Sequence, residues 1–228
     1  AVPPILSLRD RATLQNAWLA ERLDKVVPSL MRAEGVDMWV VPMREYNEDP
    51  VFTAITSPTT FAARRRTIYV FFDRGAAGIE RIALGGTSQG NVFKAVRSMK
   101  AVSAPAAGSR STDRQAELWG DEQWNILKQV IEERQPKKIA VNTSRTFAFA
   151  DGLASGERDG MLQALGPVWA AKVVPAEALA VDLVAARQPD NARRALLDGL
   201  RYHGADPVYV KAVVTFLLQR QEDAQVVA

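Results

Sequence analysis

The sequence predicts an α/β fold in which a mixed β-sheet carries helices on both of its faces. Short apolar runs typical of buried strands alternate with segments whose apolar residues recur at helical spacing. The run at 67–72 is followed by a turn at 73–78 and a second run at 79–84, which is the pattern of an antiparallel hairpin. A hairpin inside a chain of alternating strands and helices makes the sheet mixed.

A long helix is expected near the start of the chain, at residues 10–34. Asp10 or Thr13 is its expected N-cap, and Gly35 is its expected stop. Pro28 lies inside this segment and should kink the helix or divide it in two, because proline lacks the backbone N–H that a helix interior needs.

Two strands with few polar residues follow this helix. The first covers residues 36–41 and is expected to end at Pro42. The second, at 67–72, is apolar almost throughout, which indicates burial on both faces.

The second half of the chain repeats the alternation of helix and strand. A helix opens at Asp121 and ends before Pro136, and Ser155 caps another that reaches Leu165 and stops at the following Gly-Pro pair. Other expected elements are an exposed loop at 101–113, strands at 138–142 and 172–174, and helix from Ala176 onward with breaks near Gly204 and Pro207.

Composition excludes several classes of function. The chain has 29 basic and 26 acidic residues, interspersed along its length, so no basic surface for nucleic acid is expected. No apolar run approaches the roughly 20 residues of a membrane span, so no membrane partner is expected either. Cysteine is absent, which rules out disulfides, thiolate zinc sites and thiol nucleophiles.

A charged loop and a run of three arginines hold the candidate site residues. Arg44, Tyr46 and Asn47 follow the first predicted strand, while Arg64 and Arg65 precede the second. Loops at strand ends are where α/β sheets keep functional groups. In one interpretation the arginines only fix the loop by pairing with its acids, and in the other they face a partner subunit or the substrate of a neighbouring active site. The acids concerned are Glu45, Glu48 and Asp49.

Residues 86–90 match the G-x-S-x-G pattern of a nucleophile elbow. Asp182 and the lone His203 follow Ser88 in the order of a hydrolase triad. The elbow needs a strand-to-helix turn, however, and the preceding strand belongs to a hairpin, so a plain glycine-rich turn is the favoured interpretation. A surface position at a helix end is the favoured interpretation of His203.

The order of elements resembles the N-terminal domain of bacterial proteins of the creatinase/prolidase/Xaa-Pro aminopeptidase family, the pita-bread metallopeptidases. The likeness rests on the Arg-Glu-Tyr-Asn-Glu-Asp-Pro loop at 44–50, the arginine-led strand, the hairpin, the Trp-bearing helix and the segment at 142–152, and it covers residues 8–188. It implies a ribonuclease-H-like mixed sheet with helices on both faces.

In that family a catalytic domain follows and binds two divalent metal ions through two Asp, one His and two Glu. This chain has a single histidine, and residues 189–228 are too few for such a domain. No metal ligand is therefore assigned to any position, and the two metal ions implied belong to the missing catalytic domain. The expected division is an N-terminal domain at 1–188 and a helical tail, or the start of a truncated catalytic domain, at 189–228.

The resemblance implies a non-catalytic domain of a hydrolase, in which it serves oligomerisation and substrate access. Its expected partners are its own catalytic domain and a second subunit in a homodimer, and the chain alone is expected to be inactive. The alternative is a stand-alone binding or scaffold domain without a catalytic partner, with a serine hydrolase acting through Ser88 as a distant third. The compartment stays open between cytoplasm and export to the periplasm of a bacterium.

Overall fold

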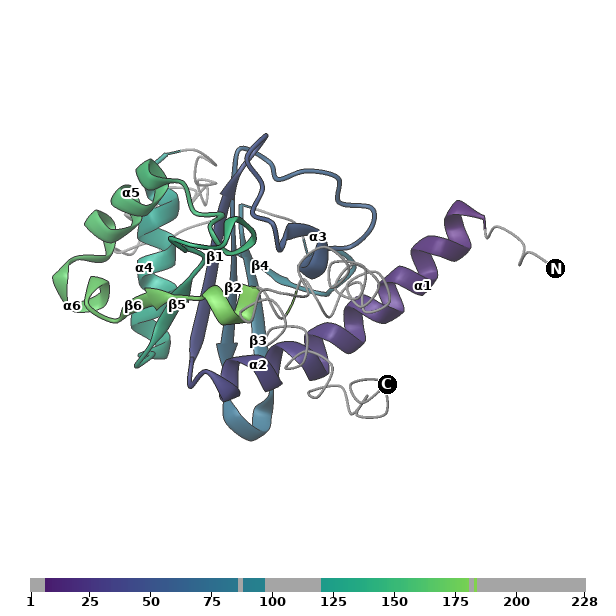
Figure 1. Ribbon diagram of the computed structural model, residues 1–228, viewed down its shortest axis with the longest axis horizontal. Helices are drawn as coiled ribbons and strands as arrows, with labels where there is room; N and C mark the ends of the chain where they lie inside the picture. Colours follow the sequence, from purple (N-terminus) through teal and green to yellow (C-terminus); the bar gives the residue numbers. More distant parts are fainter. Residues whose placement is uncertain (1–6, 86–87, 97–119, 181–182, 184–228) are drawn as a thin grey trace, which may run out of the picture. The chain divides into compact units, whose positions relative to one another are not determined.

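A six-stranded mixed sheet forms the centre of the protein in the computed structural model, which describes residues 7–85, 88–96, 120–180 and 183 (Figure 1). The strand order is β4-β3-β2-β1-β5-β6. All described residues belong to one compact unit, residues 1–184. The expected loop at 101–113 and the expected helical tail at 189–228 lie outside the described residues.

The pairing of the strands confirms a mixed sheet. β2 pairs antiparallel with both β1 and β3, and the β2–β3 pair is the hairpin expected at 67–84. The other three pairs, β3 with β4, β1 with β5 and β5 with β6, are parallel. The strands are β1 (Met38–Arg44), β2 (Arg66–Asp73), β3 (Ile79–Leu84), β4 (Lys94–Val96), β5 (Ile139–Val141) and β6 (Val173–Pro175).

Helices cover both faces of the sheet, as expected (Figure 1). α1, α2 and α3 pack on one face, and α4, α5 and α6 pack on the other. The helices are α1 (Leu8–Glu21), α2 (Val27–Ala33), α3 (Phe52–Ile55), α4 (Glu122–Arg134), α5 (Ser155–Leu165) and α6 (Pro167–Ala170), with a π-helical segment at Arg22–Val26 and 3-10 turns at Gly75–Ala77 and Ala148–Ala150.

The core has two layers because successive side chains of a strand point to opposite faces. Trp39, Tyr69 and Phe71 pack on the α1–α3 side. Val40 and Val70, each one position away in its strand, pack on the α4–α6 side. This is why β1 and β2 read as continuous apolar runs in the sequence.

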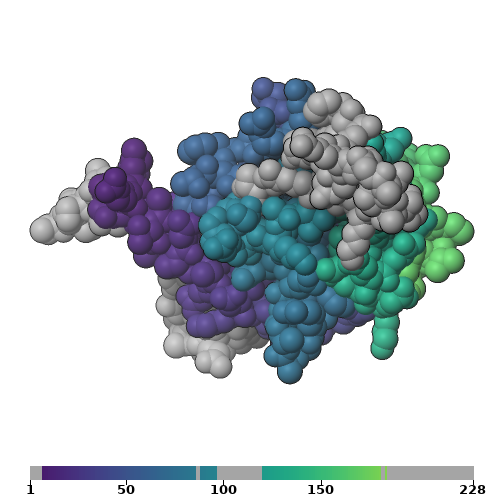
Figure 2. Space-filling view, turned by 180° about the vertical axis from the view of Figure 1, so that it is seen from behind, coloured from purple at the N-terminus to yellow at the C-terminus, as the bar shows by residue number. Residues whose placement is uncertain are grey.

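The first helix is present but starts earlier than expected. It begins at Leu8, and Ser7 caps it by accepting the Asp10 backbone N–H at 3.2 Å. Neither Asp10 nor Thr13 is therefore the N-cap. Gly35 follows the end of α2 with φ +60°, the left-handed conformation in which glycine commonly terminates a helix. The first turns of α1 extend beyond the sheet (Figure 1) and project from the surface (Figure 2).

The break expected at Pro28 takes the form of a π-helical segment, Arg22–Val26. The Val27 backbone N–H bonds to the Arg22 carbonyl, five residues back. Pro28 lies in the first turn of α2, where the missing N–H of a proline is tolerated. The wider turn just before it thus divides the long helix in two.

β1 does not end at Pro42, and this expectation was wrong. The Met38 N–H points toward β5, where it donates to the Lys138 carbonyl at 3.2 Å. Pro42 lies four positions further along the strand, so its backbone nitrogen faces the same side as that of Met38. β5 pairs with β1 only as far as Val40, so no neighbouring strand needs an N–H from Pro42. The proline is therefore accommodated inside the strand, opposite Ile68 of β2.

Smaller differences concern helix ends and short elements. Ser155 is the first residue of α5 and not its cap, and Gly166 ends α5 while Pro167 begins α6 at once. The helix expected from Asp121 is present as α4. α3, β4 and α6 were not expected from the sequence. Residues 177–180 are helical, as expected after β6.

Candidate functional site

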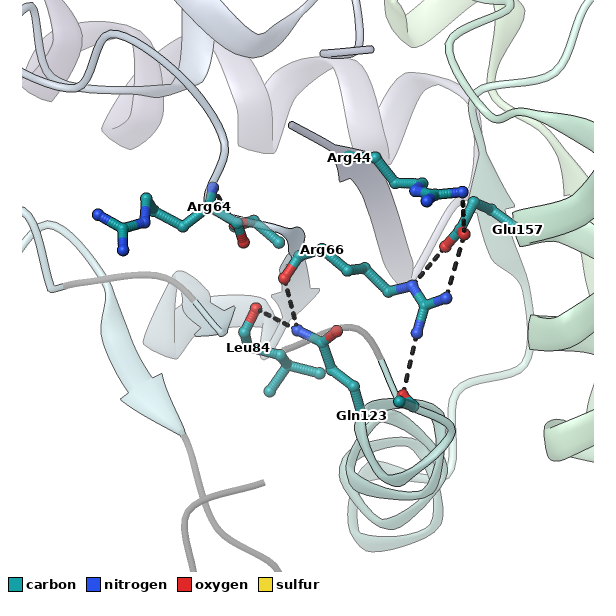
Figure 3. A network of polar contacts seen from close by, with 8 residues as sticks. Arg44, Arg64, Arg66, Leu84, Gln123 and Glu157 are labelled. Carbon is teal, nitrogen blue, oxygen red and sulfur yellow. Dashed lines mark hydrogen bonds and ion pairs between the residues drawn. The ribbon is translucent and has the colours of Figure 1, made fainter. Parts of the chain in front are cut away.

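The candidate site lies at the end of the sheet where β1 stops and β2 begins (Figure 3). Arg44, the last residue of β1, is the register partner of Arg66, the first residue of β2. The two arginines share an acceptor but differ in exposure, so their roles differ.

Arg66 is a buried structural residue. Its Nε donates to Oε2 of Glu157, and its Nη2 donates to Oε1 of the same carboxylate at 3.1 Å. Its Nη1 donates to the Gly120 carbonyl at 3.0 Å, and the guanidinium lies 4.6 Å from the centroid of the Trp124 ring. All three guanidinium nitrogens are bonded within the domain, so Arg66 ties β2 to α4 and α5.

Arg44 reaches the same carboxylate but remains open to solvent. Its Nη1 lies 3.5 Å from Oε1 of Glu157, and 61% of its side chain is exposed. Glu157 therefore orients the Arg44 guanidinium while leaving most of its donors available. Two guanidinium groups share one carboxylate, which leaves a positive charge at the surface.

The loop after β1 is a tight turn held by backbone bonds. Asn47 donates its N–H to the Arg44 carbonyl at 3.0 Å, and the Arg44 N–H returns to the Asn47 carbonyl at 3.4 Å. Tyr46 sits at the tip with φ +67° and a relative exposure of 93%. The turn thus presents a tyrosine to solvent on a defined backbone.

The turn is also fixed to the segment that leads into β2. The Glu45 N–H donates to the Arg65 carbonyl at 2.7 Å, and the Glu45 carboxylate accepts the Arg65 N–H at 3.3 Å. The Glu48 carboxylate accepts the Ala63 N–H at 3.0 Å. Glu45 and Glu48, two of the acids that one interpretation paired with the arginines, thus fix the loop through backbone N–H groups.

The predicted site residues on the β2 side face solvent. Arg64 and Arg65 are both exposed, and Arg65 has φ +55°. The Arg64 guanidinium points away from the Arg66–Glu157 pair (Figure 3). The structure thus brings the five predicted site residues to one end of the sheet without converging their side chains on a single point.

Phe61 was missed in the sequence, and it lies two residues before Ala63, whose N–H the Glu48 carboxylate accepts. It lies in the segment before β2 with a relative exposure of 89%. The available signal was its context, because it follows Ser57-Pro-Thr-Thr, a stretch typical of turns. We call Arg44, Tyr46, Phe61, Arg64 and Arg65 the arginine–aromatic surface.

Among the described residues, no group of three or more His, Cys, Asp or Glu side chains is arranged to hold a metal ion.

An open hollow of about 430 Å³ lies at the opposite end of the sheet, beside Asp37 and Asp73. Arg32 donates to both carboxylate oxygens of Asp73 there, and this bonding lowers the pKa of Asp73. These two charged groups of the lining are therefore bonded to each other. No helix in the described ranges combines the length and apolar character required to span a membrane.

The surroundings of Ser88 differ from a nucleophile elbow. β3 is antiparallel to β2, and residues 89–92 form turns that lead toward strand β4 where an elbow would have a helix. The Ser88 carbonyl accepts the Phe93 N–H at 3.0 Å within these turns. Asp182 and His203 lie outside the described residues.

Comparison of the chain with known protein families, characterised proteins and solved structures finds no match.

Proposed function

We propose that the chain works by protein association, with the arginine–aromatic surface as its interface to a second copy. The observation that carries this is the near-complete exposure of two large aromatic side chains, Tyr46 and Phe61, on segments bonded to each other. Exposed aromatic residues beside arginine are the residue types enriched at interface centres.

The rigidity of the surface supports the same proposal. The Glu45 and Glu48 bonds hold both segments in place before any partner arrives. Glu157 likewise restrains Arg44. Ordering these groups on association therefore costs less conformational entropy than ordering a free loop.

We place this association in a larger protein. The sequence resemblance to the creatinase/prolidase/Xaa-Pro aminopeptidase family supports a role as the non-catalytic N-terminal domain of a metal-dependent peptidase, with a ribonuclease-H-like fold. In that setting the domain joins two subunits and shapes access to an active site in a separate catalytic domain, which holds the two metal ions. The mixed sheet with helices on both faces is compatible with this role.

Sedimentation velocity over a range of concentrations tests the interface. The wild type is expected to form a dimer, and Tyr46→Ala and Phe61→Ala should each raise its dissociation constant by about 30-fold, which corresponds to the ~2 kcal/mol of a typical hot spot. Trp18→Ala is the matched control, because this aromatic residue is 51% exposed but lies on α1. A wild type that stays monomeric, or a dimer that only the control weakens, would contradict the interface.

The parent gene tests the larger role. A reading frame that continues with two Asp, one His and two Glu in the order of a metal centre would support the peptidase. A parent protein without such a domain would favour the stand-alone binding or scaffold domain.

A further inference from the structure

Asp49 is a buried carboxyl group at which two distant segments meet. It is 1% exposed, and its Oδ1 accepts the Val51 N–H and the Asn142 side-chain amide, each at 2.9 Å. Asn142 is fully buried and accepts the Trp39 indole N–H at 2.8 Å. The carboxyl group therefore links the end of the loop after β1 to the segment that follows β5.

The second oxygen of Asp49 is not satisfied in the same way. Among the described residues, Oδ2 has no hydrogen-bond partner. It lies against the backbone of Gly152, where a Cβ would come within 2.0 Å of it. A charged oxygen in such a place is costly, because neither a donor nor a cation compensates for its lost hydration.

The charged neighbours of Asp49 do not relieve this cost. The nearby charge that acts on Asp49 is that of Asp151, which is another acid. Oδ1 of Asp151 accepts the Ser144 N–H at 3.1 Å, and the Glu48 carboxylate accepts the Ala63 N–H. The remaining polar groups on Asp49 come from Asn142 and the Val51 backbone, which are neutral.

We propose that Asp49 is a protonation-dependent joint between the loop at 45–51 and the segment at 142–152. In the protonated state, Oδ1 keeps its two donors and the proton resides on Oδ2, so the joint is closed and neutral. In the ionised state, the joint holds an uncompensated buried charge, and the two segments separate more readily to let water reach it.

The pKa of Asp49 determines in which direction pH shifts the joint between its closed and open states. Burial raises its pKa from 3.8 to about 6, the bonds from Val51 and Asn142 oppose this rise, and Asp151 adds to it. A group with a raised pKa favours the closed state fully below its ordinary pKa of 3.8. That preference is lost as pH rises from about 4 to about 6, so opening becomes easier toward neutral pH.

The joint also has a consequence for association through the arginine–aromatic surface, and this consequence rests on the proposed function. Tyr46 lies in the loop that the joint secures, so loosening the joint removes part of the preorganisation of the interface. Association through this surface should then be weaker at pH 7.5 than at pH 5. The joint itself does not depend on whether the chain associates.

Hydrogen exchange of the whole chain at pH 5 and pH 7.5, corrected for the intrinsic exchange rate, tests the joint. The opening constant of both segments should rise about tenfold between these two pH values, as linkage gives for a carboxyl whose pKa falls from about 6 to 3.8 on opening. Asp49→Asn keeps an acceptor at Oδ1 and cannot ionise, so its opening should be independent of pH. Asp37→Asn is the matched control, because Asp37 also accepts backbone N–H groups but at the far end of the sheet, and it should keep the wild-type response.

A wild type whose two segments are equally protected at both pH values would overturn the proposal, as would an Asp49→Asn variant that retains the pH response. If this variant does not fold, the wild-type exchange decides together with a ¹³C titration of the Asp49 carboxyl. A carboxyl that titrates at or below its ordinary pKa would then overturn the joint. A pH-dependent joint in a strictly monomeric chain would contradict the interface alone.

Discussion

Gly152 occupies a position where a single methyl group decides whether two segments can pack. A Cβ at this residue would lie 2.0 Å from Oδ2 of Asp49 and 2.9 Å from its Cα. The Cα belongs to the backbone, where the Asp49 carbonyl accepts the Phe52 N–H at 2.8 Å, so it cannot move aside as a flexible side chain would.

We therefore expect Gly152→Ala to lower the free energy of unfolding by about 3 kcal/mol, at the upper end of the usual cost of overpacking. Urea denaturation measures it. Gly156→Ala is the control, because a Cβ there meets nothing within 4 Å and alanine is the better helix former inside α5. Its stability should rise by up to ~1 kcal/mol, and a loss of stability equal to that of Gly152→Ala would contradict the packing argument.

The buried Arg66–Glu157 pair leads to a second prediction at the scale of residues. Glu157→Gln removes the charge that compensates the Arg66 guanidinium, whose side chain is only 11% exposed. Breaking one partner of a buried pair typically costs ~3–5 kcal/mol. The double variant Arg66→Met with Glu157→Met should be less destabilised, because it leaves no buried charge.

Urea denaturation of the wild type, Glu157→Gln and the double variant measures the difference in their free energies of unfolding. Glu21→Gln is the control, since it breaks an exposed pair with Lys25 and should change stability by less than ~1 kcal/mol. A Glu157→Gln variant as stable as this control would mean that water reaches the Arg66 guanidinium after all.

The sequence predicted five residues at this end of the sheet, but not which of the neighbouring arginines is buried. β2 begins at Arg66, whereas Arg65 precedes the strand with φ +55°, and the reason for the burial of Arg66 is Glu157, which is 91 positions away. Similarly, the acids of the loop bond to backbone N–H groups, which carry no signal in the sequence. Phe61 was missed because exposure of an aromatic residue depends on the whole fold.

At the scale of elements, the long periodic segments and the short strands β5 and β6 were predictable, whereas α3, α6 and β4 were not. α4, α5 and the β2–β3 hairpin follow from apolar spacing and turn residues alone. α3 and β4 have four and three residues, so their own propensity is weak and tertiary packing decides them. The extension of β1 through Pro42 required knowing that β5 ends early, which only the register shows.

The order of β3, turn and β4 leads to a prediction about Ser88. A nucleophile elbow places its serine on a sharp turn from a strand into a helix, and here the turns lead into a strand. We expect a fluorophosphonate probe to leave the chain unlabelled, as judged by intact mass spectrometry. A known serine hydrolase serves as the positive control, and labelling that both Ser88→Ala and His203→Ala abolish would restore the triad.

At the scale of the whole molecule, the supply of metal ligands limits what this chain can do by itself. A catalytic metal centre for peptide hydrolysis uses several His, Asp or Glu ligands and an open position for water. The chain has one histidine and no cysteine. Within the described ranges, its His, Asp and Glu side chains form no group of three or more that could hold a metal ion. Several of them are already engaged by arginine side chains or backbone N–H groups, as Asp73, Glu80 and Glu157 show.

We therefore expect the chain alone to bind no manganese, cobalt or zinc in stoichiometric amount and to hydrolyse no Xaa-Pro dipeptide. Metal analysis after dialysis and a dipeptidase assay with each added ion measure the two properties. His203→Ala is the informative variant, because a site built on the lone histidine would lose its metal with this change. Turnover that rises in proportion to bound metal and disappears in His203→Ala would contradict the division of labour proposed here, since catalysis would then reside in this chain. Inactivity of this chain beside an active parent protein would instead assign the chemistry to the second domain and leave association to the first.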